Sequence, residues 1–175
     1  MTPAARYGGR PPLYAGWGRR VAASLVDLLV LVVGAVPMLV GAQLWRHDAV
    51  AGRTTRTDAF GQTLTTDGDP SGLALTVTLV GALVYLVVWF WNRCLRQGRT
   101  GRSLGKSVFG LLLVDDRRGL PVGSGVAFLR ELAHNIDSLV CYLGWLWPLW
   151  DSRYQTLADK LCSTVVVVQR ADAAA

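Results

Sequence analysis

Ionisable side chains inside apolar segments are the residues of this chain that could do chemistry. Asp27 lies in an apolar run that begins at Arg20 and extends to about Leu44. A carboxylate at the centre of a membrane-spanning helix costs roughly 2.5–3.5 kcal/mol on insertion scales, so it needs a compensating partner or a function. Asp27 is therefore either a carrier of protons or cations, or a structural lock that is hydrogen-bonded between helices. We favour the structural role, because a single carboxylate is weak evidence for transport.

A second group of ionisable residues lies in the third apolar region of the chain. Arg130, His134 and Asp137 recur at i, i+4 and i+7, so they share one face of a helix. From that face, Arg130 or His134 could reach Asp27 if the helices pack together. Metal binding by His134 is not expected, because no second ligand stands at a metal-binding spacing from it.

Asp159 belongs to a short polar stretch near the C-terminus, Thr156-Leu157-Ala158-Asp159-Lys160. It can cap a short helix there or pair with Arg20 at the membrane interface, and both roles are structural. Arg20 stands seven residues before Asp27, about 10 Å along a helix, so no direct pair is expected between them. Arg20 could equally anchor among the lipid headgroups. The candidate functional polar cluster is therefore Arg20, Asp27, Arg130, His134, Asp137 and Asp159.

The elements that position these residues are those of an integral membrane protein. Of 175 residues, 51% are hydrophobic and only 17% are charged, against about 25% charged residues in soluble proteins. An apolar helix of about 20 residues crosses a bilayer. Two runs meet that length, at about residues 18–45 and 73–91, and a third apolar helix is predicted at about residues 124–150.

These elements form one predicted membrane domain over residues 18–170. The first run is too long for the apolar core of a cleavable signal peptide and is expected to stay as an anchor. Residues 1–17 are rich in Gly, Pro and Arg, so they are expected to form a disordered cytoplasmic N-terminus. Residues 171–175 form a tail.

Positive charge sets the predicted orientation. Five cations follow the second run at once, whereas the loop at residues 46–71 is slightly acidic. By the positive-inside rule, both ends of the two-helix hairpin are cytoplasmic, in a multi-pass protein of the cell membrane. The net charge of +6 flanks apolar runs in this way, so no nucleic-acid partner is expected. The predicted basic cytoplasmic face consists of Arg93, Arg96, Arg99, Arg102 and Lys106.

Residues 124–150 leave two topologies open. Their uninterrupted apolar stretch is about 12 residues, which is short for a span. The region either crosses the membrane with its polar stripe toward the other helices, or enters and returns as a broken helical hairpin. Residues 163–168 predict a β-strand that needs a partner for its backbone, and residues 111–115 on the cytoplasmic side are the candidate. Pairing brings the C-terminus back inside, so we favour the re-entrant topology.

The predicted fold is therefore an all-α membrane protein. It has a two-helix transmembrane hairpin, a third polar-striped helical region, and a small cytoplasmic two-stranded β element. Residues 104–111 are expected to form a short interfacial helix with cations at the headgroups. Its predicted lipid-facing residues are Leu104, Val108 and Leu111, and its headgroup cations are Arg102 and Lys106.

The triplet Gly105-Lys106-Ser107 does not make a phosphate-binding loop. That motif needs a Gly where Thr100 stands, behind a buried strand, and the preceding element here is a membrane helix. Nucleotide binding is therefore not expected.

Three blocks of sequence stand in a specific order and, with Leu129-Arg130-Glu131 before the last apolar run, cover nearly the whole chain. They are Arg20-x6-Asp27; Thr100-Gly101-x-Ser103-x-Gly105-Lys106-x3-Gly110, which leads into Val114-Asp115; and the stretch from Gln155 to Val167, which contains Asp159. Their combination resembles the RDD family of bacterial membrane proteins, whose name refers to one arginine and two aspartates.

By this resemblance, Arg20 corresponds to the family's arginine and Asp27 to its first aspartate. Asp159 is assigned as the second aspartate, and Asp137 is the alternative. The chain departs from the family at Cys162-Ser163, where Ala-Gly is usual, and this bears on local packing only. The resemblance implies a membrane protein for which transport has been proposed, and it gives no substrate.

Two functions of different classes stay open. The first is transport of a small solute or cation, with coupling to protons as one form, and so few spans could build a path only as a homo-oligomer or with partner membrane subunits. The second is a non-transporting scaffold or accessory protein that recruits partners on its basic cytoplasmic face. An enzyme is not expected, since the sequence has no nucleophile–base pair or metal motif, and neither is a cofactor. Both hypotheses require the lipid bilayer as a partner.

Overall fold

The helices and strands of the chain group into two compact units. The computed structural model describes residues 12–139 and 143–169. The head unit comprises the described residues up to Leu29 and from Trp89 onward, and the helix-pair unit comprises Val30–Val88.

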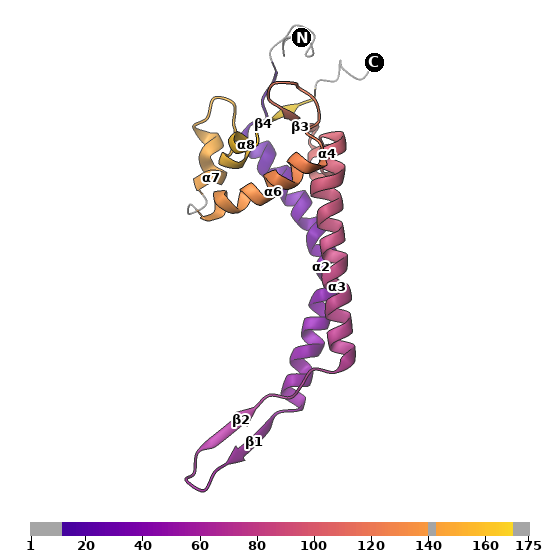
Figure 1. The fold of residues 1–175 in the computed structure, drawn as a ribbon, viewed down its shortest axis with the longest axis vertical. Helices are drawn as coiled ribbons and strands as arrows, with labels where there is room; N and C mark the ends of the chain where they lie inside the picture. The colour runs from indigo at the N-terminus through magenta and orange to yellow at the C-terminus, as the bar shows by residue number, and fades with distance from the viewer. Residues whose placement is uncertain (1–11, 140–142, 170–175) are drawn as a thin grey trace. The chain divides into compact units, whose positions relative to one another are not determined.

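Two long helices carry most of the apolar residues, as the hydropathy pattern predicts. Helix α2 covers Trp17–Ala51, and helix α3 covers Gly72–Phe90 (Figure 1). Helix α3 continues through a π-helical segment, η1, at Trp91–Arg96 and the short helix α4 at Gln97–Thr100. Both long helices are apolar enough to cross a membrane, which confirms the predicted two-helix hairpin.

Both helices extend past the predicted spans at residues 18–45 and 73–91. The added residues include Arg, Gln and Ala, which are good helix formers. Gly101 ends the second helix with a φ of 72°, a left-handed conformation that favours glycine.

In the helix-pair unit, small residues let α2 and α3 approach each other closely. A Cβ added at Gly81 would overlap the backbone of Met38, and one added at Gly41 would overlap Thr78. Small residues at such positions allow the van der Waals packing that holds helix pairs together in membranes. This unit is therefore held by close packing of its two helices, and many of its other apolar side chains are exposed.

An antiparallel hairpin lies in the connection between α2 and α3, where the sequence predicts only a polar loop at residues 46–71. Strand β1 covers Thr54–Thr57 and strand β2 covers Thr63–Thr66. All their residues are exposed. A strand with no buried face shows no alternation of apolar and polar residues, so the pattern gives no signal for it.

The core of the head unit is a second antiparallel pair of strands. Strand β3 covers Leu111–Asp115 and strand β4 covers Thr164–Val168. Leu113 lies opposite Val166, and both residues are almost fully buried. This pair confirms the small two-stranded β element that the backbone hydrogen bonds of each strand require.

The segment that precedes α2 extends this sheet. The Ala15 amide donates to the Val166 carbonyl at 2.9 Å, and Ala15 is fully buried. The predicted disorder of residues 1–17 is therefore wrong for residues 12–17, because the edge of β4 offers their backbone hydrogen-bond partners. Residues 1–11 and the predicted tail at residues 171–175 lie outside the described residues.

Residues 124–150 form separate helices rather than one span. Helix α6 covers Ser124–Leu139, α7 covers Leu143–Leu146, and a 3-10 turn follows at Trp147–Leu149. Strands β3 and β4, before and after this region, pair with each other, so the chain returns to the side from which it entered. A single crossing of a membrane would separate these paired strands, so the crossing topology is wrong, and entry into the membrane followed by return stays a prediction. The last helix, α8 at Leu157–Leu161, packs against α6 (Figure 1).

Helix α5 covers Leu104–Val108 and is largely buried in the head unit. The sequence predicts Leu111 toward lipid and Lys106 at the headgroups, and both predictions are wrong. Leu111 is fully buried in the core, and Lys106 is only 8% exposed. Only Val108 of the predicted lipid-facing residues is exposed. The reason is the close approach of α2 at Gly105, which covers the helix.

Helix α6 is polar on its buried face and apolar on its exposed face. Arg130, His134 and Asp137 are all buried, which confirms the polar stripe predicted from their spacing. The exposed side chains include Phe128, Leu129, Leu132 and Ile136. A surface helix in water shows the opposite arrangement. The exposed face of α6 therefore suits contact with lipid.

Candidate functional site

Asp27 lies on α2 in the head unit and accepts hydrogen bonds from three neutral donors. Its Oδ1 accepts from Asn92 Nδ2 at 2.9 Å and from the Gly105 amide at 2.8 Å. Its Oδ2 accepts from Ser103 Oγ at 2.5 Å, and the residue is 1% exposed. The donors come from η1 and from the start of α5, so one carboxylate joins three elements that are distant in sequence.

Local structure prepares these donors. Ser103 is the N-cap of α5, because its hydroxyl oxygen accepts from the Lys106 amide at 3.2 Å and leaves its proton for Asp27. Asn92 Oδ1 accepts from the Leu104 amide at 2.8 Å, so the amino end of the Asn92 side chain faces Asp27. These local hydrogen bonds therefore orient the Asn92 and Ser103 side chains so that each can donate to Asp27.

Glycine is required at the third donor position. A Cβ added at Gly105 would overlap the Ala23 carbonyl oxygen of α2 and would lie 3.0 Å from the Asp27 carboxyl carbon. Only a residue without a side chain lets α5 come close enough for its amide to reach Asp27.

Asp159 is held by two arginines and by the cap of α8. Its Oδ1 accepts from Arg130 Nε at 2.7 Å, and its Oδ2 pairs with Arg20. Its Oδ2 also accepts from the Thr156 amide at 3.1 Å, while Thr156 Oγ1 accepts from the Asp159 amide at 3.0 Å. This reciprocal pair is a capping box. Both predicted structural roles of Asp159, helix cap and partner of Arg20, are confirmed.

Charges compensate one another strongly at Asp159. Burial acts to raise the pKa of its carboxyl group, but the positive charges of Arg130 and Arg20 hold that pKa well below its usual range. Burial acts to lower the pKa of Arg130, and the negative charges of Asp159 and Glu131 raise it instead. Both groups are therefore ionised at neutral pH.

His134 pairs with Asp137 and joins α6 to α7. His134 Nδ1 lies 2.6 Å from Asp137 Oδ2, and the imidazole stacks on the Trp145 ring with 4.5 Å between centroids. Burial and the charge of Arg130 lower the pKa of His134, so the ring is neutral at pH 7 and donates from Nδ1. Among residues 12–139 and 143–169, no group of three or more His, Cys, Asp or Glu side chains could hold a metal ion.

Lys106 and Arg93 are two further cations of the head interior. Lys106 Nζ donates to Gln97 Oε1 at 2.6 Å, and Arg93 donates to Glu131 Oε2 at 3.4 Å. Burial, and then the positive charges of Arg130 and Arg93, lower the pKa of Lys106 to about 7. Lys106 therefore changes its charge near neutral pH.

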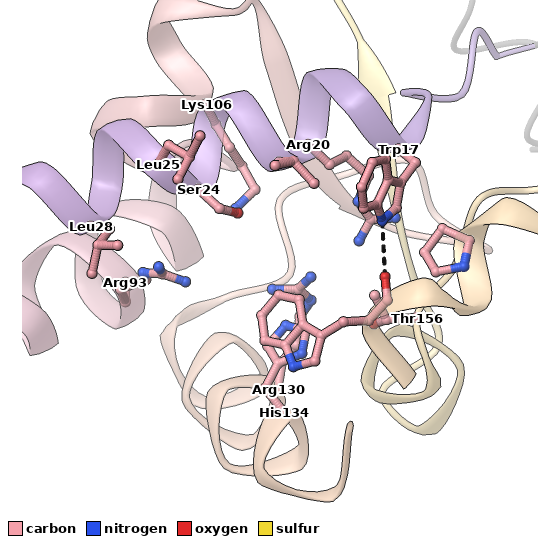
Figure 2. A pocket seen from close by; sticks show the side chains of 13 residues that line it. Trp17, Arg20, Ser24, Leu25, Leu28, Arg93, Lys106, Arg130, His134 and Thr156 are labelled. Atoms are coloured by element: carbon pink, nitrogen blue, oxygen red, sulfur yellow. Dashed lines mark hydrogen bonds between the residues drawn. The ribbon is translucent and has the colours of Figure 1, made fainter. Parts of the chain in front are cut away.

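A cavity of about 330 Å³ lies among these groups (Figure 2). Arg93, Lys106 and Arg130 extend from η1, α5 and α6 toward the space beside α2. A hydrogen bond of 3.0 Å from Trp17 Nε1 to the Trp145 carbonyl links α2 to α7 at this cavity. The lining thus combines cations with the apolar side chains of α2.

The structure divides the predicted polar cluster. One group is Arg20, Arg130 and Asp159, and another is His134 with Asp137. Asp27 has partners of its own, and its predicted contact with Arg130 or His134 is wrong. The reason is that Asp159 engages Arg130 and Asp137 engages His134.

The predicted basic face is only partly a surface. Arg99 is exposed and Arg102 is half-buried, as a face requires. Arg93 and Lys106 turn into the head instead, and Arg96 donates to a serine hydroxyl of α5 at 3.0 Å. A charge that follows an apolar run predicts the side of the membrane, and it does not predict whether the side chain faces water.

Three neutral members of the site are not among the residues predicted from the sequence. Asn92, Ser103 and Gln97 are all fully buried. A signal existed for Ser103, because a serine at the start of a short helical pattern is an N-cap candidate. Asn92 and Gln97 stand among arginines directly after an apolar run, and nothing in that pattern marks them as buried.

Two apolar helices, a third helix with its polar face buried, and a head held by buried charges define a membrane protein with a polar interior. The profile of the RDD family matches residues 14–163, and the chain belongs to that family. No solved structure matches the chain.

Proteins similar to this chain occur in mycobacteria. The proline-rich antigen homolog of Mycobacterium tuberculosis is 38% identical over 164 residues, which cover 88% of this chain and 63% of that protein. The proline-rich antigen of Mycobacterium leprae is 36% identical over 153 residues, which cover 87% of this chain and 60% of that protein. The chain thus spans less than two thirds of the length of these relatives.

Proposed function

We propose that this chain is a multi-pass protein of the cell membrane that serves as a scaffold or accessory protein, and that its signature charges hold the head together. One observation carries the proposal: the buried aspartates are already engaged by fixed protein donors. Asp27 accepts three hydrogen bonds, and Asp159 pairs with two arginines. A carboxylate that carries protons or cations must release such partners in every cycle, and breaking buried pairs is costly.

We place the head on the cytoplasmic side of the membrane, together with the N-terminus. The positive-inside rule supports this orientation, because exposed cations gather on the head. They include Arg19, Arg99, Arg117, Arg118 and Arg153. The apolar face of α6 then lies at the boundary between headgroups and acyl chains. Partner proteins are expected on the exposed basic surface.

Transport is a second candidate, and the cavity favours it. A space of this size, lined by cations beside an apolar helix, can admit a small charged solute. Two spans cannot enclose a path, so this candidate requires a homo-oligomer or partner membrane subunits.

Flux measurements on liposomes separate the two candidates. The purified chain and its Asp27→Asn variant are reconstituted, and the movement of protons, small cations and small anions is followed under imposed gradients. A scaffold gives no flux above empty liposomes for either protein, with native helix content in both. Flux that is present in the wild type, lost in Asp27→Asn and kept in Asp48→Asn overturns the scaffold. Asp48 is the matched control, because it lies in the helix-pair unit, where its carboxylate accepts a hydrogen bond from the Ser71 amide.

A further inference from the structure

The cavity beside α2 presents positive charge to whatever occupies it. Among the described residues, its lining includes four cationic side chains and no carboxylate; the cations are Arg20, Arg93, Lys106 and Arg130. The carboxylates that pair with these cations, Asp159 and Glu131, lie outside the lining. The cavity therefore suits an anion.

Some of the donors at the cavity are unused. Within the described part of the chain, Arg93 Nε is buried and has no hydrogen-bond partner. Lys106 Nζ carries three protons when charged, and one of them is donated to Gln97. A buried donor without a partner costs free energy, so an acceptor that enters the cavity would be stabilised. Guanidinium and ammonium groups together are the usual recognition set for a phosphate group.

Apolar side chains of α2, a helix long and apolar enough to cross a bilayer, also line the cavity. Val21, Leu25 and Leu28 of α2 line it. Leu25 is 59% exposed and Leu28 is 52% exposed, on a helix that is long and apolar enough to cross a bilayer. The surface that lipid chains would cover thus continues into the cationic cavity.

We propose that this cavity binds the phosphate of an anionic membrane lipid, with the acyl chains lying along the exposed leucines of α2. The shared chemistry is a phosphate ester; the apolar wall favours the lipid over a soluble phosphate ester. The inference rests on the proposed scaffold function only in placing the head at the membrane surface. Basic pockets beside membrane helices bind anionic headgroups elsewhere by the same chemistry.

Lipid retention tests the proposal directly. The full chain is purified from mixed bilayers of phosphatidylcholine and phosphatidylglycerol, and the bound lipid is counted by native mass spectrometry. The wild type is expected to retain phosphatidylglycerol over phosphatidylcholine. The Arg93→Gln variant should lower this preference about five-fold, since one cation near an anionic lipid contributes about 1 kcal/mol. Leu28→Asn should lower the retention as well.

Arg99→Gln is the matched control. Arg99 is an exposed cation on the helix that follows η1, and it does not line the cavity. Equal losses in Arg93→Gln and Arg99→Gln would show attraction by general charge and would overturn the site. Displacement of the lipid by free glycerol phosphate, with no effect of Leu28→Asn, would overturn the lipid and identify a soluble phosphate ester. Circular dichroism confirms that each variant is folded.

The pH dependence gives a second readout. Lys106 faces Asp27 from α2, Arg93 and Gln97 from η1 and α4, and Arg130 and Glu131 from α6. Its loss of a proton removes one cation from the lining, so retention should weaken between about pH 6 and about pH 8. The Lys106→Arg variant should hold its retention constant over that range. If lipid retention by the wild type does not depend on pH, Lys106 does not contribute to the lipid site. The flux assay and the lipid assay test different claims. Flux together with retained lipid would overturn the scaffold and keep the lipid site, whereas absence of both flux and retained lipid would keep the scaffold and overturn the lipid site.

Discussion

Asp27 and Asp159 are both almost fully buried, and their surroundings differ in charge. Asp27 accepts from a side-chain amide, a hydroxyl and a backbone amide, which are all neutral. Asp159 pairs with the two guanidinium groups of Arg20 and Arg130. The difference follows the position of each residue. Asp27 lies inside an apolar helix, where neutral donors bring no further charge into the membrane region, whereas Asp159 lies on α8 beside other ionised groups.

The two sites should therefore respond differently to the loss of their carboxylate. Loss of the Asp159 carboxylate leaves two buried cations without compensation, and loss of the Asp27 carboxylate leaves only neutral donors without a partner. An unpaired buried charge costs more than an unpaired neutral donor. We therefore expect the larger effects at Asp159.

Asp159→Ala should produce the largest loss of stability. It breaks the pairs with Arg20 and Arg130 and removes the capping box of α8, and breaking a buried pair alone costs about 3–5 kcal/mol. Thermal unfolding in detergent, followed by circular dichroism, measures the effect. Asp67→Ala is the control, since Asp67 pairs with Arg53, both side chains are exposed, and a surface pair contributes about 0–1 kcal/mol. Equal shifts in the two variants would contradict the assigned charge cluster.

Two substitutions at Asp27 should differ in the next range of effects. Asp27→Leu leaves the donors of Asn92, Ser103 and Gly105 without an acceptor, at about 1–3 kcal/mol each. Asp27→Asn keeps one acceptor oxygen and should cost about 1–3 kcal/mol in total. The unfolding temperature in detergent should be highest for the wild type, lower for Asp27→Asn and lowest for Asp27→Leu. A chain in which neither variant loses stability would contradict the structural lock.

The sequence predicts the parts of this site that depend on local pattern or on backbone pairing. The stripe of α6 follows from the spacing of Arg130, His134 and Asp137. The pairing of β3 with β4 follows from the need of each strand for a partner, and it also excludes a single crossing by residues 124–150. The cap formed by Asp159 follows from the stretch after Thr156.

The partners of Asp27 could not be predicted in this way. Asn92 is 65 residues away in sequence and Ser103 is 76 residues away, and no periodic pattern connects them with α2. The inward direction of Lys106 depends on the close contact that Gly105 permits. Local patterns place a residue on an element, and tertiary packing decides which element it meets.

Gly105→Ala probes that packing with no change of charge. Its Cβ would overlap the Ala23 carbonyl oxygen and press on the Asp27 carboxyl group, and overpacking of this kind costs about 1–3 kcal/mol. Chemical denaturation in mild detergent measures the change. Gly125→Ala, in α6, is the control, because a Cβ there meets nothing within 4 Å and should be neutral or slightly stabilising. A loss confined to Gly125→Ala would contradict the close approach of α5 and α2.

The smallest expected effect, about 1.4 kcal/mol for each pH unit, is a dependence of stability on pH that comes from Lys106 rather than from either aspartate. Its pKa is lowered by burial and by neighbouring cations from 10.5 to about 7. Between these values the unfolded chain binds one more proton than the folded chain, so stability rises with pH from about 7 to about 10.5 and is constant below about 7. Asp159 adds no slope there, because its lowered pKa makes its contribution present at all pH values above the unfolded pKa of 3.8.

The Lys106→Met variant tests whether Lys106 causes this dependence of stability on pH. Unfolding midpoints measured across that window should rise with pH in the wild type and lose that rise in the variant. Lys160→Met is the control, because Lys160 is exposed and should leave the rise unchanged. If Lys106→Met and the wild type follow the same curve, Lys106 is protonated in both states, and Asp27 then has a full positive charge beside its neutral donors. In that outcome the two aspartates would differ in the number of cations around them, and not in kind.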